Sequence, residues 1–272
     1  MTIGHRNDFS DILLKGMLWS IAWLAVVLLL APTLVVVIVS FTDGYSLRFP
    51  PEGFSTRWYV ALFKAFTLHF AAWNSFLVAL MTTVLCVVLG TGASLAIARS
   101  QSKTARALDA VFMSPLILPG LAFGLSALIF FSKLGMPVSM TTLVIGHTVV
   151  CVPYVIRTTS SALAQMAPAL LESAASLGAS RAHALRRITL PLIAPGIAAG
   201  AFIAFMSSFD NTAVSLFLRD ARTDMLPIRM WQDLESKLDV TIAALSSVLV
   251  LVTLVMMLIM EKLTGISRRI RG

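Results

Sequence analysis

The side chains that most often catalyse reactions or bind metals are few and scattered in this sequence. Its four histidines, at positions 5, 69, 147 and 183, lie far apart, and neither H-E-x-x-H nor G-x-S-x-G occurs. Cys86 and Cys151 lack C-x-x-C spacing and lie in apolar stretches, which is typical of small buried hydrophobic residues. The P-loop pattern G-x-x-x-x-G-K-S/T is absent as well. The sequence therefore predicts a protein that is not an enzyme and holds no metal or cofactor of its own.

Asp210 is the one acidic residue deep within a long apolar stretch, 19 residues after Pro191. A charged side chain inside a membrane costs at least ~2.5–3.5 kcal/mol on insertion scales, and such residues usually have a function. If the stretch is one helix, Ser207, Asp210 and Asn211 share a face and could line a polar path that attracts a cation. The alternative is a structural role for Asp210, either paired with another subunit or placed near the outer mouth of the path.

Three further polar residues lie in apolar stretches. Asn74 and Tyr154 are candidates either for lining the same path or for hydrogen bonds that hold helices together. His147 is a lone histidine in such a stretch, which is more typical of a hydrogen-bonded packing residue than of a ligand site.

The composition indicates that membrane helices hold these residues in place. Of the 272 residues, 58% are hydrophobic and only 12% are charged, and the mean hydropathy is +0.89. Soluble domains carry about 25% charged residues, so a cytosolic enzyme, a disordered chain and a secreted disulfide scaffold are excluded. A transmembrane β-barrel is excluded too, because its strands would need a polar residue at every second position.

Six windows of at least 21 residues contain no Asp, Glu, Lys or Arg. A membrane-spanning helix needs about 20 residues, so each window predicts one span. The first window is longer than the apolar core of a signal peptide, about 7–15 residues, and is expected to be retained as a membrane helix. The sequence thus predicts an all-α integral membrane protein that forms a single domain over residues 1–272. Its six transmembrane helices are expected near residues 17–41, 73–98, 107–131, 140–160, 191–218 and 240–261.

Basic residues indicate which ends of the spans face the cytoplasm. Thirteen of the 21 Lys and Arg residues lie in the segments 1–16, 99–106, 157–190 and 262–272. Cytoplasmic loops carry an excess of Lys and Arg, so both termini and the loop 161–190 are predicted to be cytoplasmic. The net charge of +8 then reflects orientation in the lipid membrane and does not indicate nucleic-acid binding.

Glycine and proline positions predict how the helices pack and bend. Gly120-x-x-x-Gly124 and Gly196-x-x-x-Gly200 place small residues four apart, which lets helix backbones approach closely in a membrane. Proline removes a helix hydrogen bond, so kinks or local unwinding are expected at Pro115, Pro119 and Pro153.

Two loops are predicted to lie outside. Residues 54–66 place large apolar side chains four apart, from Phe54 to Phe66, which predicts a short amphipathic helix at the membrane surface. Residues 219–239 carry charges of both signs, which indicates a solvated surface suited to meeting another protein.

The segment between the fourth and fifth spans, residues 161–190, carries the strongest local signals. Pro168 can start a helix, because the N–H that it lacks would be unpaired there anyway. Gly178 can end that helix in a left-handed conformation, and Ser180 can cap a second helix. The segment is therefore predicted to form a compact helix–glycine–helix elbow on the cytoplasmic side, suited to docking another protein.

This elbow resembles the E-A-A-x-x-x-G loop of permease subunits in binding-protein-dependent ATP-binding cassette (ABC) importers. The matching residues here are Glu172, Ser173, Ala174, Ala175 and Gly178, closed by Leu190-Pro191. Ser173 stands where the family has Ala, and serine is small enough to fit. The resemblance extends over nearly the whole chain, through His147-Thr148, Pro153-Tyr154 and the six-helix layout, and implies the type I ABC importer permease fold.

The resemblance is more specific toward one branch of that family. Three stretches are similar to permeases of the spermidine/putrescine type, namely Ser207-Ser208-Phe209-Asp210-Asn211, Leu226-Pro227 and Thr241-Ile242-Ala243-Ala244. This implies an importer for a polyamine or a related small amine. An amino-acid derivative or a phosphonate is the alternative solute. An ion-coupled transporter is disfavoured, because it would need more intramembrane charge and often an internal repeat.

The resemblance also implies partners in the bacterial inner membrane. Residues 172–178 would form a coupling helix that sits in a groove of an ATPase subunit. A second, related permease, two ATP-binding subunits that hold ATP and Mg, and a soluble extracytoplasmic solute-binding protein are expected. ATP binding would close the ATPase pair, move the elbows and turn the path outward, and hydrolysis would reset it.

Overall fold

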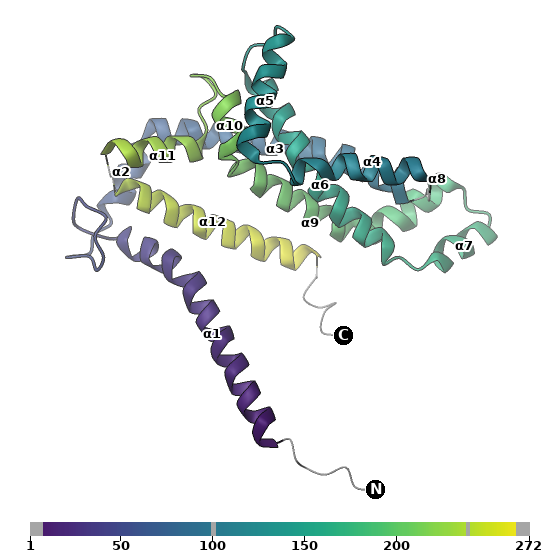
Figure 1. Cartoon of the computed structure of the whole chain (residues 1–272), viewed down its shortest axis with the longest axis horizontal. Helices are drawn as coiled ribbons and strands as arrows, with labels where there is room; N and C mark the ends of the chain where they lie inside the picture. Colours follow the sequence, from purple (N-terminus) through teal and green to yellow (C-terminus); the bar gives the residue numbers. More distant parts are fainter. Residues whose placement is uncertain (1–7, 99–101, 238–239, 265–272) are drawn as a thin grey trace. The chain divides into compact units, whose positions relative to one another are not determined.

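A computed structural model describes residues 8–98, 102–237 and 240–264 of the chain. Apart from loops, turns and one isolated bridge, this described part is helical (Figure 1). Its helices are α1 (Asp8–Val39), α2 (Arg57–Lys64), α3 (Phe66–Ala98), α4 (Lys103–Met113), α5 (Gly120–Lys133), α6 (Met140–Ala164), α7 (Pro168–Ser176), α8 (Arg181–Ala184), α9 (Leu190–Phe209), α10 (Thr212–Leu218), α11 (Leu226–Lys237) and α12 (Thr241–Thr264).

Within the described residues, five helical stretches are long and apolar enough to cross a membrane. They are Asp11–Val39, α3, α6, the run Arg181–Phe209 and Thr241–Lys262. A sixth span results if α4 and α5 are counted together as one broken span. The predicted all-α membrane fold is confirmed, although helix limits differ from the expected ones: α3, for example, begins at Phe66 rather than near residue 73.

The segment expected as the third span, residues 107–131, is sharply broken. A 3-10 turn, Ser114–Leu116, follows α4, and α5 then runs at 104° to the helix before it. Pro115 lies in the turn and Pro119 directly precedes α5, and neither can donate a helix hydrogen bond. The predicted kink is therefore confirmed here. At Pro153, by contrast, α6 continues as an α-helix.

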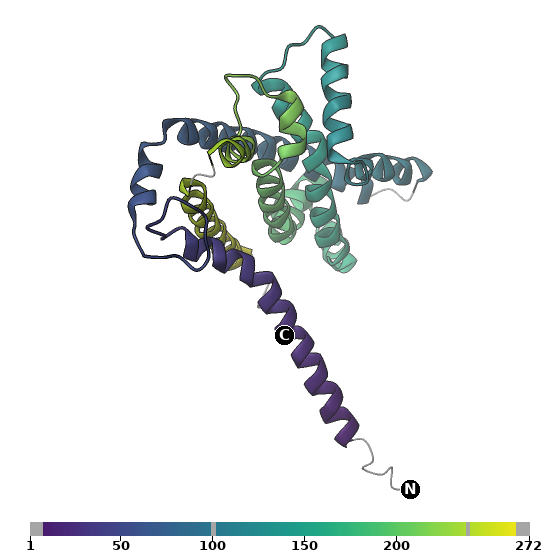
Figure 2. The same cartoon turned by 60° about the vertical axis from the view of Figure 1, so that its left-hand side comes forward.

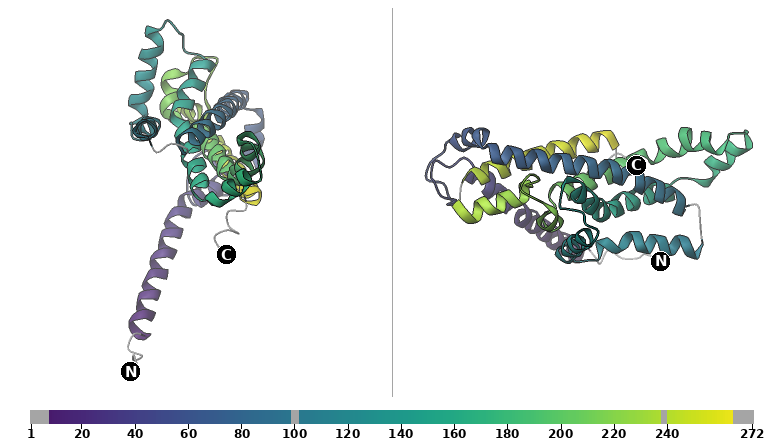
Figure 3. Two further views of the ribbon diagram at one scale, coloured as in Figure 1. Left: turned by 90° about the vertical axis from the view of Figure 1, so that its right-hand side faces the viewer. Right: turned by 90° about the horizontal axis from the view of Figure 1, so that it is seen from above.

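The described chain forms two compact units, one of residues 8–64, 233–237 and 240–251 and one of residues 65–98, 102–232 and 252–264. The larger unit is built on α3, α6 and α9, which pack side by side (Figures 1 and 3). Buried polar groups join these helices: Ser94 of α3, for instance, donates its hydroxyl to a carbonyl of α6 at 3.1 Å.

Glycines let the helices of the larger unit approach closely. A Cβ atom added at Gly196 would lie 2.6 Å from the Cβ of Ala162 in α6, a distance that real contacts do not reach. One added at Gly124 of α5 would lie 2.8 Å from the carbonyl oxygen of Ala213 in α10. Both small-x-x-x-small pairs therefore pack against other helices, as predicted.

A buried apolar cluster of the larger unit gathers side chains from α3, α5, α6, α10 and the start of α11. Its buried members are Val78, Phe131, Leu143, Val144, Val214, Leu218, Met225 and Ile228. The segment that follows α9 is thus held against the bundle by side-chain packing.

The smaller unit joins the end of α1 to α2 and to the first turns of α12 (Figure 2). Val39 and Val240 lie in its buried apolar contact. The Tyr59 hydroxyl lies 2.7 Å from the hydroxyl of Ser40 and 2.8 Å from that of Ser247, so one side chain links all three segments. The apolar length of α1 is otherwise unburied, which leaves its surface for lipid or another subunit.

The predicted surface helix is α2, which begins at Arg57, so Phe54 lies outside it. The Arg57 guanidinium lies over the rings of Tyr45 and Trp58, 4.2 and 4.7 Å from their centroids. It also pairs with Asp43 at 3.4 Å. These contacts fix the loop before α2 to the helix itself.

Candidate coupling elbow and translocation path

The elbow has the local structure that its sequence predicts. α7 begins at Pro168 and closes in a Schellman turn, in which the N–H groups of Gly178 and Ala179 donate to the carbonyls of Ala175 and Ala174, both at 3.0 Å. Gly178 has a φ of +80°, a left-handed value that residues with a Cβ rarely adopt. The predicted helix start and glycine turn are both confirmed.

Ser180 caps the helix after the turn, since its hydroxyl accepts the N–H of His183 at 3.2 Å. This helix does not stop where the fifth span was expected to begin. α8 passes through a π-turn, Leu185–Thr189, directly into α9, so residues 181–209 form one helical run. Pro191 lies in the first turn of α9, directly after the π-turn, where it offers no N–H to the helix. The elbow is therefore continuous with a membrane helix.

Most of the predicted coupling residues are exposed. The exposed ones are Glu172, Ser173, Ala175 and Gly178, whereas Ala174 is buried. The sequence prediction missed Leu177, whose side chain is 88% exposed at the tip of the elbow. Its position directly before the turn glycine was the available signal, because a large apolar residue in an exposed turn points to a contact with another molecule.

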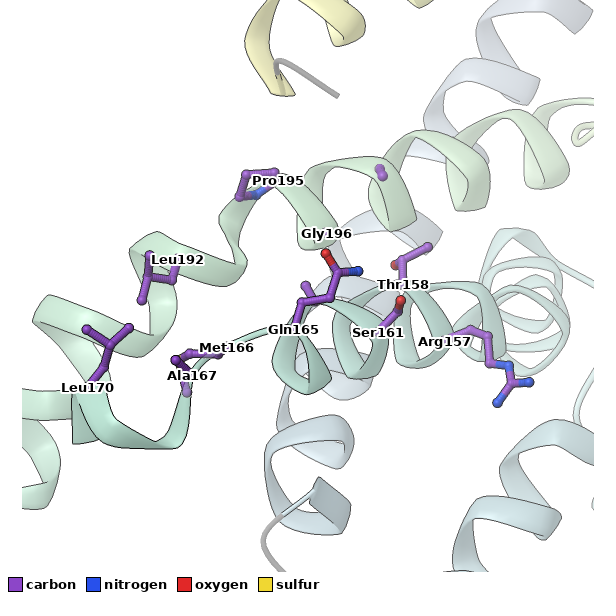
Figure 4. Close-up of a pocket in the computed structure, with 12 residues that line it drawn as sticks. Arg157, Thr158, Ser161, Gln165, Met166, Ala167, Leu170, Leu192, Pro195 and Gly196 are labelled. Atoms are coloured by element: carbon purple, nitrogen blue, oxygen red, sulfur yellow. The ribbon is translucent and has the colours of Figure 1, made fainter. Parts of the chain in front are cut away.

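A cavity of about 850 Å³ lies between the elbow, α6 and α9. In Figure 4, Leu170 of α7 and Leu192 of α9 lie at one end of the cavity and Arg157 of α6 at the other, with Thr158 and Gln165 between them. Because this space is not filled by side chains, α7 has room to shift relative to α6 and α9.

The expected fifth span is broken at Asp210. α9 ends one residue earlier, Asp210 follows as its C-cap, and Asn211 caps α10 by accepting the N–H of Val214 at 2.9 Å. The interpretation of residues 191–218 as one helix, with Ser207, Asp210 and Asn211 on one face, is therefore wrong. Asparagine before an apolar run is a helix-start signal, so the sequence did contain evidence for this break.

The structure divides the predicted path residues between two places. Asp210, which is exposed, and Asn211 lie at the break between α9 and α10. Ser207 lies in the last turn of α9, and Tyr154 lies in α6, where it packs against the buried cluster that contains Cys151 and Ala204 of α9. Tyr154 therefore belongs to the contact between α6 and α9.

His147 is fully buried in α6 and joins the two sides of the break. Its Nδ1 lies 2.8 Å from the hydroxyl of Ser208 in α9, and its Nε2 lies 3.0 Å from the hydroxyl of Ser215 in α10. A neutral imidazole can donate from one nitrogen and accept at the other, so both ring nitrogens are satisfied. The prediction of a hydrogen-bonded packing role is confirmed, and this packing holds α9 and α10 on either side of Asp210.

Asn74 is buried and ties down the loop that joins α10 to α11. Its side-chain amide donates to the carbonyls of Arg222 and Asp224, both at 3.1 Å. Beside it, the hydroxyl of Ser75 accepts the N–H of Leu226 at 2.8 Å, where α11 begins. Asn74 was a candidate either for lining the path or for hydrogen bonds that hold helices together. These contacts are of the second kind, because they join distant segments of one unit.

Charged side chains within the loop between α10 and α11 also form contacts that stabilise it. Arg219 and Asp224 form a partly buried ion pair of 2.8 Å. The Asp220 carboxylate accepts the hydroxyl of Thr223 and the N–H groups of Arg222 and Thr223. The hydrogen bond from the Thr223 hydroxyl is the main reason that the pKa of Asp220 lies below its usual range, and the hydrogen bonds from the backbone N–H groups of Arg222 and Thr223 lower it further. The loop is thus ordered by its own polar groups and presents charges of both signs.

Comparison with known proteins gives a consistent result. The spermidine/putrescine transport system permease protein PotC of Haemophilus influenzae is 29% identical over 234 residues, which cover 86% of this chain and 90% of that protein. The putrescine transport system permease protein PotI of Escherichia coli is 30% identical over 240 residues, which cover 84% and 85%. The fold is similar to that of a bacterial alginate ABC transporter crystallised with an alginate pentasaccharide-bound periplasmic protein, with a TM-score of 0.71, 17% identity, and coverage of 97% of this chain and 98% of that one.

The family match itself covers most of the chain. It extends over residues 87–269 and includes the elbow, the helical run into α9 and the break at Asp210. The elbow geometry, the set of membrane helices and this match lead to one assignment: the chain belongs to the family of binding-protein-dependent transport system inner membrane components.

Proposed function

We propose that this permease subunit serves an ATP-driven importer for polyamines, with putrescine and spermidine as the first candidates. The observation that carries the proposal is the similarity to PotC and PotI over more than four-fifths of the chain. Asp210 supports it independently, because an exposed carboxylate at a helix break can form a charge-assisted hydrogen bond with a cationic amine.

The proposed assembly has this chain beside a second, related permease. Two ATP-binding subunits bind the cytoplasmic elbows and hold ATP and Mg, and a soluble solute-binding protein binds the outer loops. Both termini of this chain lie in the cytoplasm. The excess of basic residues near the elbow and the termini supports this orientation.

Coupling follows from how the elbow is connected. Glu172 and Leu177 present one charged and one apolar side chain to the ATPase surface. When the ATPase pair closes, α7 moves with it, and the cavity between α7, α6 and α9 allows that movement. Because α8 continues into α9 without interruption, the movement reaches the break at Asp210, which lies at the far end of the same helical run.

The test is uptake of radiolabelled putrescine and spermidine in host cells from which this gene has been deleted. Deletion is expected to abolish high-affinity polyamine uptake, and the wild-type chain is expected to restore it. A phosphonate and an amino-acid derivative are measured in parallel. If uptake of one of these is lost while polyamine uptake is unchanged, polyamine is the wrong solute, although the importer assignment stands.

A further inference from the structure

A second cavity, of about 490 Å³, lies between the ends of α3 and α6, the start of α4, and the elbow. Two cationic side chains line it, Arg106 of α4 and Arg157 of α6, together with the hydroxyl-bearing Thr189 of the π-turn. Leu95 and Leu163 are among the apolar residues that line the rest. Two positive charges and an apolar wall therefore meet in one cavity that is open to its surroundings on one side.

Thr189 indicates that a polar partner is missing from this cavity. Its side chain is only 2% exposed, and its hydroxyl has no hydrogen-bond partner among the residues that the structure describes. A threonine within a helix commonly donates to the carbonyl four residues earlier, and Thr189 does not. Leaving a buried hydroxyl unpaired is unfavourable, and a hydrogen-bond acceptor inside the cavity would remove that penalty.

The two arginines have the chemistry to supply the rest of an anion site. Neither Arg106 nor Arg157 forms an ion pair within the described ranges of the chain. In Figure 4 the Arg157 guanidinium extends away from Leu170 and Leu192, so it does not enter the apolar end of the neighbouring cavity. Guanidinium groups bind phosphate through paired hydrogen bonds, which is the interaction that best satisfies two free arginines and a hydroxyl.

The depth of the cavity along α6 identifies the source of the phosphate. From Met140 to Arg157 the helix rises about 26 Å, close to the ~30 Å thickness of the hydrocarbon core. With Met140 at the opposite boundary of the hydrocarbon core, Arg157 is expected where headgroups meet acyl chains. Basic pockets between membrane helices on the cytoplasmic side are known sites for lipid headgroups. We propose that this cavity binds the headgroup of a membrane phospholipid, whose phosphate contacts Arg106, Arg157 and Thr189 and whose glycerol and upper acyl chains lie along Leu95 and Leu163.

Asp109 gives this site a selectivity. It also lines the cavity, three residues after Arg106 on α4. A carboxylate beside a phosphate site repels an anionic headgroup and attracts an ammonium group. The site is therefore selective for phosphatidylethanolamine, whose amine contacts Asp109, over phosphatidylglycerol, which carries no positive charge.

The experiment uses the full-length chain, purified in detergent with whatever subunits accompany it. Native mass spectrometry counts the phospholipids retained per chain after addition of phosphatidylethanolamine, phosphatidylglycerol or inorganic phosphate. Replacing both arginines, as Arg106→Gln with Arg157→Gln, is expected to remove one retained lipid. Thr189→Val should weaken retention by roughly tenfold, since it deletes a hydrogen bond to a charged group. Lys103→Gln is the matched control: it removes a cation one turn from Arg106 that does not line the cavity.

Two further measurements make the outcome decisive. In lipid-free detergent, Thr189→Val should melt no lower than wild type, because it removes an unpaired buried hydroxyl, so its loss of lipid cannot be ascribed to misfolding. Asp109→Asn should reverse the preference toward phosphatidylglycerol. The proposal is overturned if Thr189→Val and the double arginine variant retain lipid as Lys103→Gln does. It is also overturned if inorganic phosphate alone displaces the lipid, because the cavity would then be a site for a free anion.

Discussion

Replacing Gly178 with valine tests whether the shape of the elbow determines ATPase docking. The φ of +80° at Gly178 is the only obstacle to a side chain, since a Cβ atom placed there would meet no heavy atom within 4 Å. A residue with a Cβ in this left-handed region is strained by about 1–2 kcal/mol, and more when it is β-branched. The turn must either bear this strain or open, and opening breaks the two Schellman hydrogen bonds, to Ala174 and Ala175. A penalty of that size corresponds to roughly a 5- to 30-fold loss of the docking-competent turn.

The assay is co-purification of the ATPase subunit together with solute uptake. We expect Gly178→Val to lower both strongly, Gly178→Ala to have an intermediate effect, and Gly178→Asn to have little effect, because asparagine tolerates the left-handed region. Gly135→Val is the matched control: Gly135 has a φ of +69° and equally open surroundings, but it follows α5, outside the elbow. Wild-type co-purification and uptake by Gly178→Val, or an equal loss from Gly135→Val, would refute the docking role of the turn.

Three other predictions concern the path, the orientation and the outer loop. Asp210→Asn, which is nearly isosteric, should lower cation uptake per assembled complex by about tenfold, as expected for a lost charge-assisted bond; a ratio near one would remove Asp210 from the path. A cysteine at 182 should react with an impermeant thiol reagent only in inside-out vesicles, and one at 222 only in intact cells; the reverse pattern would invert the proposed topology. Because bonding to Thr223 lowers the pKa of Asp220 in the folded loop, its stabilising effect is present above the usual aspartate pKa and is lost as the pH falls through the lowered value. The protection factors of the amides in residues 219–225, which are exchange rates corrected for intrinsic exchange at each pH, should therefore fall only below the usual aspartate pKa for wild type, whereas Asp220→Asn should lower them already at neutral pH; equal protection factors at neutral pH would contradict this account.

Features that depend on a few neighbouring residues could be predicted from the sequence. Pro168, Gly178 and Ser180 shape the elbow because helix ends are decided by missing N–H groups, permitted φ values and side-chain caps within one turn. The bend around Pro115 and Pro119 has the same local origin. The charge-free windows predicted the membrane helices from local sequence as well. A backbone exposed to lipid must satisfy its hydrogen bonds internally, so a long apolar window is expected to form a helix.

The break at Asp210 shows where this local reasoning was insufficient. The apolar run on both sides favours one continuous helix, and only the Asn211 cap argues against it. In the structure, His147 bonds Ser208 and Ser215 on opposite sides of the break, from a helix more than sixty residues earlier in the chain. No spacing within residues 191–218 contains that information.

The same holds for the residues whose neighbours are distant in the chain. By itself, the sequence determined that Asn74 is a polar residue in an apolar stretch, and it left the role of Asn74 open. Only the tertiary structure decided that Asn74 finds two loop carbonyls some 150 positions away, and that Thr189 is one of the residues lining a cavity with two arginines and has no side-chain hydrogen-bond partner among the described residues. A buried polar group needs a complementary group within hydrogen-bond distance. Here the neighbouring residues in the chain do not supply that partner. Only the packing of distant segments against one another determines which groups come that close.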